Sequence, residues 1–144
     1  MSEVRVREAT VADAEALAPL LEVLGYPADP AVLRGRLASL RRDDPTGRVL
    51  VADLEGRVLG VATLHLTPVL HRPTPVGRIT ALAVLREAHG TGVGRRLVAE
   101  AERYFAEAGL GRVEVTSGRL HEDAYGFYRH LGYADHGVRF AKVI

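Results

Sequence analysis

Three glycines at alternate positions, Gly90, Gly92 and Gly94, constrain this chain more than any other feature. They lie between a strand-like run, residues 78–84, and a run with the apolar spacing of a helix, residues 97–108. Glycine lets the backbone approach a ligand closely, and the free N–H groups at the start of a helix attract an anion. The strand, loop and helix together predict a phosphate-binding site.

The spacing of the glycines excludes two common phosphate loops. A dinucleotide-binding loop, Gly-x-Gly-x-x-Gly, would need its third glycine at the position of Arg95. A P-loop would end in Gly-Lys-Ser or Gly-Lys-Thr, where this chain has Gly94, Arg95 and Arg96. The missing third glycine therefore excludes a nucleotide-binding oxidoreductase, and the missing Gly-Lys-Ser/Thr ending excludes a P-loop enzyme.

Composition narrows the class of protein. The chain has 144 residues, 47% of them hydrophobic, and we expect one domain, residues 1–144, with a buried core. A net charge of +1 predicts no general attraction to nucleic acid or to an anionic membrane. Cysteine is absent, which excludes disulfides and thiolate chemistry. Without an apolar leader or a run of about 18 apolar residues, we expect a cytoplasmic protein.

Predicted elements alternate with short connections. The expected strands are 4–8, 48–53, 57–66, 78–84 and 113–117, followed by a hairpin over 133–144 that turns at His136-Gly137. Helices are expected after Thr10 up to Gly25, from Pro30 to about residue 40, from Gly94 to about Gly109, and over 122–131. This mixed order predicts an α/β fold with a central mixed sheet and helices on both faces.

Two segments resemble motifs of the GNAT acetyltransferase superfamily. Residues 89–94 are similar to motif A, Gln/Arg-x-x-Gly-x-Gly/Ala, with His89 in place of Gln or Arg. Residues 121–133 are similar to motif B, Asn-x-x-Ala-x-x-Phe/Leu-Tyr-x-x-x-Gly-Phe/Tyr, with His121 in place of Asn. The residues that match motif B are Ala124, Phe127, Tyr128, Leu131, Gly132 and Tyr133. The resemblance implies the GNAT fold, whose central mixed, mostly antiparallel sheet has six to seven strands.

The same resemblance implies an acetyl-CoA-dependent N-acetyltransferase. The glycine-rich loop would hold the pyrophosphate of acetyl-CoA, and backbone groups of the preceding strand would pair with the pantetheine arm. The implied donor-binding set is Leu82, Ala83, Val84, His89, Gly90, Thr91, Gly92, Val93, Gly94, Arg95, His121 and Ala124. No metal is expected, because residues 121–125 begin like a zinc-protease helix but have Tyr125 where a second histidine is needed.

Tyr128 is the candidate catalytic residue. Spacing alone places it with Ala124 and Leu131 on one apolar helix face, which is typical of a core residue. Its place in motif B implies instead that it faces the departing thiolate. A phenol with a pKa of about 10 can donate a hydrogen bond or proton to a thiolate whose conjugate acid has a pKa of about 8.5.

The group that deprotonates the amine is left open. An alkyl ammonium with a pKa of about 10.4 lies about 5 kcal/mol from its neutral form at pH 7. Some family members carry a glutamate on the strand before motif A, where this chain has residues 78–81, Arg-Ile-Thr-Ala. His65, His71, Glu22, Glu114 and a water relay remain as alternatives.

The expected acceptor is the amine of a small molecule or peptide. No nucleic-acid or membrane partner is expected, and self-association as a homodimer is compatible with a domain of this kind. Tyr26, residues 65–76 and the His136-Gly137 turn are expected to rim the acceptor site. The rival interpretation is a silent module of the same fold that binds acyl-CoA or a partner without turnover. His89, His121 and the missing strand carboxylate leave that rival open, whereas Tyr128 and both motifs favour an enzyme.

Overall fold

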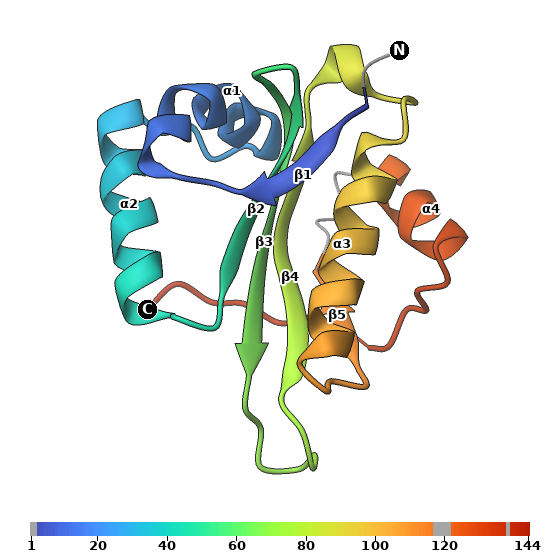
Figure 1. The fold of residues 1–144 in the computed structure, drawn as a ribbon. Helices are drawn as coiled ribbons and strands as arrows, with labels where there is room; N and C mark the ends of the chain where they lie inside the picture. Colours follow the sequence, from blue (N-terminus) through green and yellow to red (C-terminus); the bar gives the residue numbers. More distant parts are fainter. Residues whose placement is uncertain (1–2, 117–121, 138) are drawn as a thin grey trace.

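The computed structural model describes residues 3–116, 122–137 and 139–144 (Figure 1). All strands and helices expected up to residue 131 are present, with small differences at their ends. The elements are β1 (Arg5–Glu8), η1 (Val11–Asp13), α1 (Ala14–Leu24), α2 (Pro30–Asp43), β2 (Arg48–Leu54), β3 (Arg57–Thr67), β4 (Val76–Val84), η2 (Arg86–Ala88), α3 (Val93–Glu107), β5 (Val113–Val115) and α4 (Glu122–His130).

The sheet has five strands in the order β1-β2-β3-β4-β5. The first four are antiparallel to their neighbours, and β5 runs parallel to β4. Helices α1 and α2 cover one face of the sheet and α3 covers the other, with α4 beside α3 (Figure 1). Each face has its own apolar core, built from alternate residues of the same strands. The predicted mixed, mostly antiparallel sheet with helices on both faces is confirmed.

The hairpin expected over residues 133–144 is wrong. Its described residues, 133–137 and 139–144, form no strand, so the described sheet has five strands instead of six to seven. Phe140, Val143 and Ile144 are exposed. The alternation of apolar residues favours a strand only where a neighbouring strand or helix covers it, because an isolated hairpin is marginally stable in water. Among the described residues, none of the helices in the structure is long and apolar enough to cross a bilayer.

Two glycines let α3 lie close against the sheet. A Cβ on Gly60 of β3 would lie 2.9 Å from Leu97 Cδ1, and one on Gly77 of β4 would lie 2.7 Å from the Phe105 ring. Both distances are shorter than carbon atoms tolerate, so a side chain at either position would force Leu97 or Phe105 of α3 to shift. The position of the loop that precedes α3 therefore depends on packing along the whole helix.

An ion-pair network ties β1 to β2 and to the start of α1. The Arg7 guanidinium donates two hydrogen bonds of 2.9 Å to Asp13 and one of 3.0 Å to Asp53. Asp13 also accepts the N–H of Thr10 at 2.8 Å, in a capping box at the start of η1. The hydrogen bonds from Arg7 are the main reason that the pKa of each carboxyl is lowered.

We expect Arg7→Gln to lower the free energy of unfolding by about 2 kcal/mol at pH 7, because it leaves the buried carboxylate of Asp13 without its cation. Since both carboxyl pKa values are lowered by folding, this stabilisation is present above the unfolded-state pKa of about 4 and is lost as the pH falls through the folded-state values. Urea unfolding at several pH values measures both effects. Arg5→Gln on the same strand is the control and should change stability by less than about 0.5 kcal/mol. Equal effects of the two substitutions would contradict the network's role.

Candidate active site

The glycine-rich segment forms the connection between β4 and α3 (Figure 1). Gly90 and Gly92 have φ angles of 78° and 89°, and a Cβ on either would enter open space. Gly92 is the N-cap of α3, so the N–H groups of Val93, Gly94 and Arg95 have no carbonyl of a preceding helical turn to bind. The loop therefore presents free donors and the positive end of the helix dipole on its open side.

His89 and Thr91 brace this loop from within. His89 Nε2 donates a hydrogen bond of 2.9 Å to the carbonyl of Val84, the last residue of β4. The Thr91 hydroxyl donates to the carbonyl of Ala88. His89, the departure from motif A, thus has one ring nitrogen engaged in holding the loop against β4. Only its Nδ1 is left for a ligand, and the Val84 carbonyl is already used inside the protein.

The edge of β4 that faces away from β3 is open along its second half. β5 pairs only with Gly77, Arg78 and Ile79 of β4, whereas β3 pairs with β4 as far as Val84. At the same level the β3 register shifts and leaves Thr80 as an extra residue, a β-bulge, and such bulges are frequent beside active sites. Within the described part of the chain, backbone groups of residues 80–84 on this edge have no strand partner. Of the expected donor set, Leu82 and Val84 direct their backbone groups to this edge. Those of Ala83 face β3, because the Leu85 N–H bonds to the Leu59 carbonyl and hydrogen-bonded pairs recur at every second residue.

Tyr128 lies on α4, which packs over the first turn of α3. A Cβ on Gly94 would lie 3.2 Å from the Phe127 ring, so this glycine sets how closely the two helices approach. The Tyr128 ring is half-buried and makes edge contacts with the rings of Phe127 and Tyr133. Its hydroxyl has no hydrogen-bond partner in the described structure. Burial raises the pKa of Tyr128 to about 12, so the phenol keeps its proton at neutral pH.

Tyr133 holds Tyr128 in place, a role that the sequence analysis missed. The Tyr133 hydroxyl donates a hydrogen bond of 2.7 Å to Glu102 of α3, and its N–H donates to the Tyr128 carbonyl at 3.0 Å. Burial, followed by the bond to Glu102, raises the pKa of Tyr133. Its match to motif B was the available signal. Of the remaining donor candidates, Ala124 lies half-buried on α4, Arg95 is exposed, and His121 lies outside the described residues.

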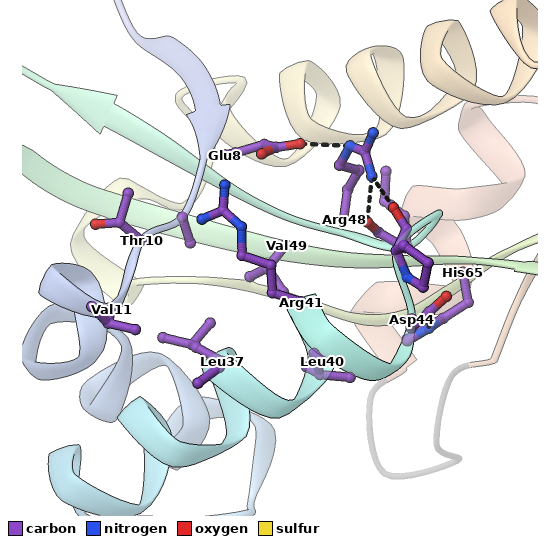
Figure 2. Close-up of a pocket in the computed structure, with 15 residues that line it drawn as sticks. Glu8, Thr10, Val11, Leu37, Leu40, Arg41, Asp44, Arg48, Val49 and His65 are labelled. Atoms are coloured by element: carbon purple, nitrogen blue, oxygen red, sulfur yellow. Dashed lines mark hydrogen bonds and ion pairs between the residues drawn. The ribbon is translucent and has the colours of Figure 1, made fainter.

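A hollow of about 340 Å³ opens on the α2 side of the sheet (Figure 2). Its walls are the end of β1, the second half of α2, the start of β2, and residues 64–65 of β3. None of its lining residues belongs to segment 82–95. Leu64 pairs with Ile79, the last β4 residue that β5 covers. The β3 wall of the hollow is therefore one strand spacing, about 5 Å, from the point where the β4 edge opens.

Most charged groups that line the hollow are paired. His65 Nδ1 donates a hydrogen bond of 2.7 Å to Asp44, which leaves Nε2 as the free ring nitrogen. Arg48 forms an ion pair of 2.5 Å with Glu8. Arg41 has no carboxylate partner among the residues that the structure describes, and its side chain points from α2 toward the end of β1 (Figure 2). The hollow thus combines a histidine–carboxylate pair with one uncompensated arginine.

Among the four side chains considered as bases, only His65 lines the hollow. Glu114 accepts a hydrogen bond of 2.8 Å from Arg112, which lowers its pKa and makes it a poor proton acceptor. His71 and Glu22 are exposed, on the β3–β4 loop and on α1. Tyr26 and His136, expected at the rim of an acceptor site, do not line the hollow either.

Comparisons with known proteins identify the family of this chain. Residues 15–133 match the Acetyltransferase (GNAT) family. The aminoalkylphosphonate N-acetyltransferase of Salmonella typhimurium is 32% identical to this chain over 96% of this chain and 90% of that protein. A mycothiol acetyltransferase of Pseudarthrobacter chlorophenolicus is 29% identical over 75% of this chain, a match that covers 34% of that longer protein.

Solved structures share the fold. An acetyltransferase of Trypanosoma brucei superposes with a TM-score of 0.83 at 24% identity, with 99% of this chain and 100% of that chain covered. An aminoglycoside N-acetyltransferase in complex with CoA superposes with a TM-score of 0.82 at 18% identity, over 99% of this chain and 96% of that chain. The family match is accompanied by the fold and by the glycine loop at the start of α3. The chain therefore belongs to the GNAT acetyltransferase family and is an acyltransferase.

Proposed function

We propose that this chain, as one domain over residues 1–144, transfers the acetyl group of acetyl-CoA to a primary amine of a small acceptor. The observation that carries the proposal is the open second half of β4, which leads to the free N–H groups at the start of α3. An extended amide-bearing chain suits the strand edge, and a pyrophosphate suits the helix start. The aminoalkylphosphonate acetyltransferase from Salmonella supports a small amine as acceptor.

The chain's own groups suit acetyl-CoA at this place. Free N–H groups between Gly90 and Arg95 would bind the pyrophosphate, and the Arg95 guanidinium would add positive charge. The backbone groups of Leu82 and the N–H of Val84, which face the open edge, would pair with the pantetheine amides. When bound, acetyl-CoA supplies the thioester whose carbonyl carbon bonds to the acceptor nitrogen while the C–S bond breaks and CoA leaves as the thiol. His89 would act mainly by holding the loop against β4.

His65 is the proton acceptor in this proposal. Its free Nε2 would take the proton of the incoming ammonium, through a water where the distance requires one, and release that proton to solvent. Asp44 fixes the ring by binding Nδ1–H and would stabilise the imidazolium that forms. The second amine proton, lost as the C–N bond forms, passes through water to the departing thiolate, which ends as the thiol. The hollow beside His65 would hold the rest of the acceptor.

Tyr128 is the hydrogen-bond donor to sulfur in this proposal. With its pKa at about 12, full proton transfer to a thiolate whose conjugate acid has a pKa of about 8.5 would be uphill by about 5 kcal/mol. A hydrogen bond from the buried hydroxyl has no such cost and strengthens as charge develops on sulfur. Tyr128 would therefore stabilise the departing thiolate, which ends as a thiol after a net proton shift from the amine.

Tyr128→Phe should lower kcat by about 10²-fold, because the ring stays and only the donor to sulfur is removed. Acetyl-CoA affinity and the melting temperature should change little, since the hydroxyl has no partner within the described structure. Steady-state kinetics, calorimetry and thermal melts measure the three quantities. Tyr125→Phe, at an exposed position of the same helix, is the control. A kcat within about threefold of the parent value would show that Tyr128 only packs and takes no part in catalysis.

His65→Gln should lower kcat/KM for the amine by about 10²-fold at neutral pH, because the free ring nitrogen is lost. Steady-state kinetics with the amine as the varied substrate measure the loss. Asp44→Asn should have an intermediate effect. His71→Gln, an exposed histidine outside the hollow, is the control. If His65→Gln keeps the parental kcat/KM, another group removes the proton.

A further inference from the structure

We infer that the acceptor carries an anionic group, a phosphonate, phosphate or carboxylate, and that Arg41 binds it. The inference rests on the proposed function, because it takes the hollow beside His65 as the acceptor site. It adds the class of substrate: a small molecule with a primary amine at one end and an anion at the other.

The charges of the hollow single out Arg41. Arg48 is neutralised by Glu8 at 2.5 Å, and Asp44 is engaged by His65 at 2.7 Å. When His65 holds a proton, the Asp44 charge is matched as well. Arg41 is then the one cation of the lining without a counterion among the described residues. An anionic acceptor would supply that counterion, and a guanidinium can bind a carboxylate or phosphonate through two parallel hydrogen bonds.

The layout of the hollow separates the two ends of such an acceptor. His65 and Asp44 lie at one end, and the Arg41 side chain extends toward Glu8 and Thr10 at the other (Figure 2). Apolar side chains line the space between them, Leu37, Leu40 and Val49. A short alkyl chain would contact these side chains while its amine faces His65. The volume of about 340 Å³ is near the lower limit for ligand pockets, which favours a small molecule over a peptide.

A helix-capping role alone does not account for Arg41. Cations near a helix C-terminus are favourable, and both Arg41 and Arg42 lie in the last turn of α2. Arg42, however, forms an ion pair of 3.1 Å with Asp43 and does not line the hollow. The two neighbouring arginines therefore lie in the same turn of α2, but only Arg41 lines the hollow. Arg42 is the matched control for Arg41.

The test compares three amines of similar length: 2-aminoethylphosphonate, 3-aminopropanoate and n-propylamine. We expect the parent to acetylate the two anionic amines with kcat/KM at least about 10-fold above that of n-propylamine. Arg41→Gln should lower kcat/KM for the preferred anionic amine about 30-fold, mainly through KM, and leave n-propylamine within about twofold. Arg41→Lys should recover part of the loss, because it keeps the charge without the planar fork. Arg42→Gln should behave like the parent.

The outcomes separate this inference from the proposed function. If n-propylamine is acetylated as well as the anionic amines, or if Arg41→Gln slows all three equally, the amine acetyltransferase stands and the anion site is wrong. If the parent acetylates none of them, the proposed function is in question, and calorimetry of 2-aminoethylphosphonate in the presence of CoA decides the anion site. Binding weakened at least about 10-fold by Arg41→Gln but not by Arg42→Gln supports it. Absent or unchanged binding overturns it.

Discussion

The pairing of β4 is the constraint on which the site depends. β3 covers one edge of this strand up to Val84, whereas β5 covers the other edge only at residues 77–79. Among the described residues, the backbone groups of Leu82 and Val84 on this second edge therefore have no strand partner. Because α3 packs closely on Gly60 and Gly77, its first turn lies just beyond the open edge. The open edge of β4 and the first turn of α3 therefore present their free backbone groups next to each other.

Several charged groups of the described residues are balanced by close partners. The net charge of +1 produces no long-range attraction, so each ionic function is carried by a small cluster of side chains. Arg7 joins two carboxylates and keeps the start of α1 against the sheet edge. On the α2 side, two further pairs leave Arg41 as the uncompensated cation of the hollow. At the loop before α3, the anion would instead be met by backbone N–H groups.

Local sequence patterns predicted the loop and the helix of the candidate site, which depend on neighbouring residues. The glycine spacing indicated the loop, and the motif match around Tyr128 indicated the helix beside it. The hollow could not be predicted, because Glu8, Arg41 and His65 are distant in the sequence and meet only through sheet pairing and the packing of α2. The hydrogen bond from Tyr133 to Glu102 is equally non-local. The predicted C-terminal hairpin failed for the same reason, since alternation at residues 133–144 says nothing about whether a partner strand is present.

Binding of acetyl-CoA at the start of α3 is tested most directly by calorimetry on two glycine variants. Gly92 and Gly109 flank α3, both have a positive φ angle, and a Cβ on either enters open space. Gly92→Asp adds a carboxylate and bulk where the backbone must approach the pyrophosphate, so acetyl-CoA affinity should fall at least about 10-fold. Gly109→Asp places the same residue at a positive φ angle at the other end of α3 and should leave acetyl-CoA affinity unchanged. Parental affinity in a folded Gly92→Asp variant would show that the cofactor binds elsewhere.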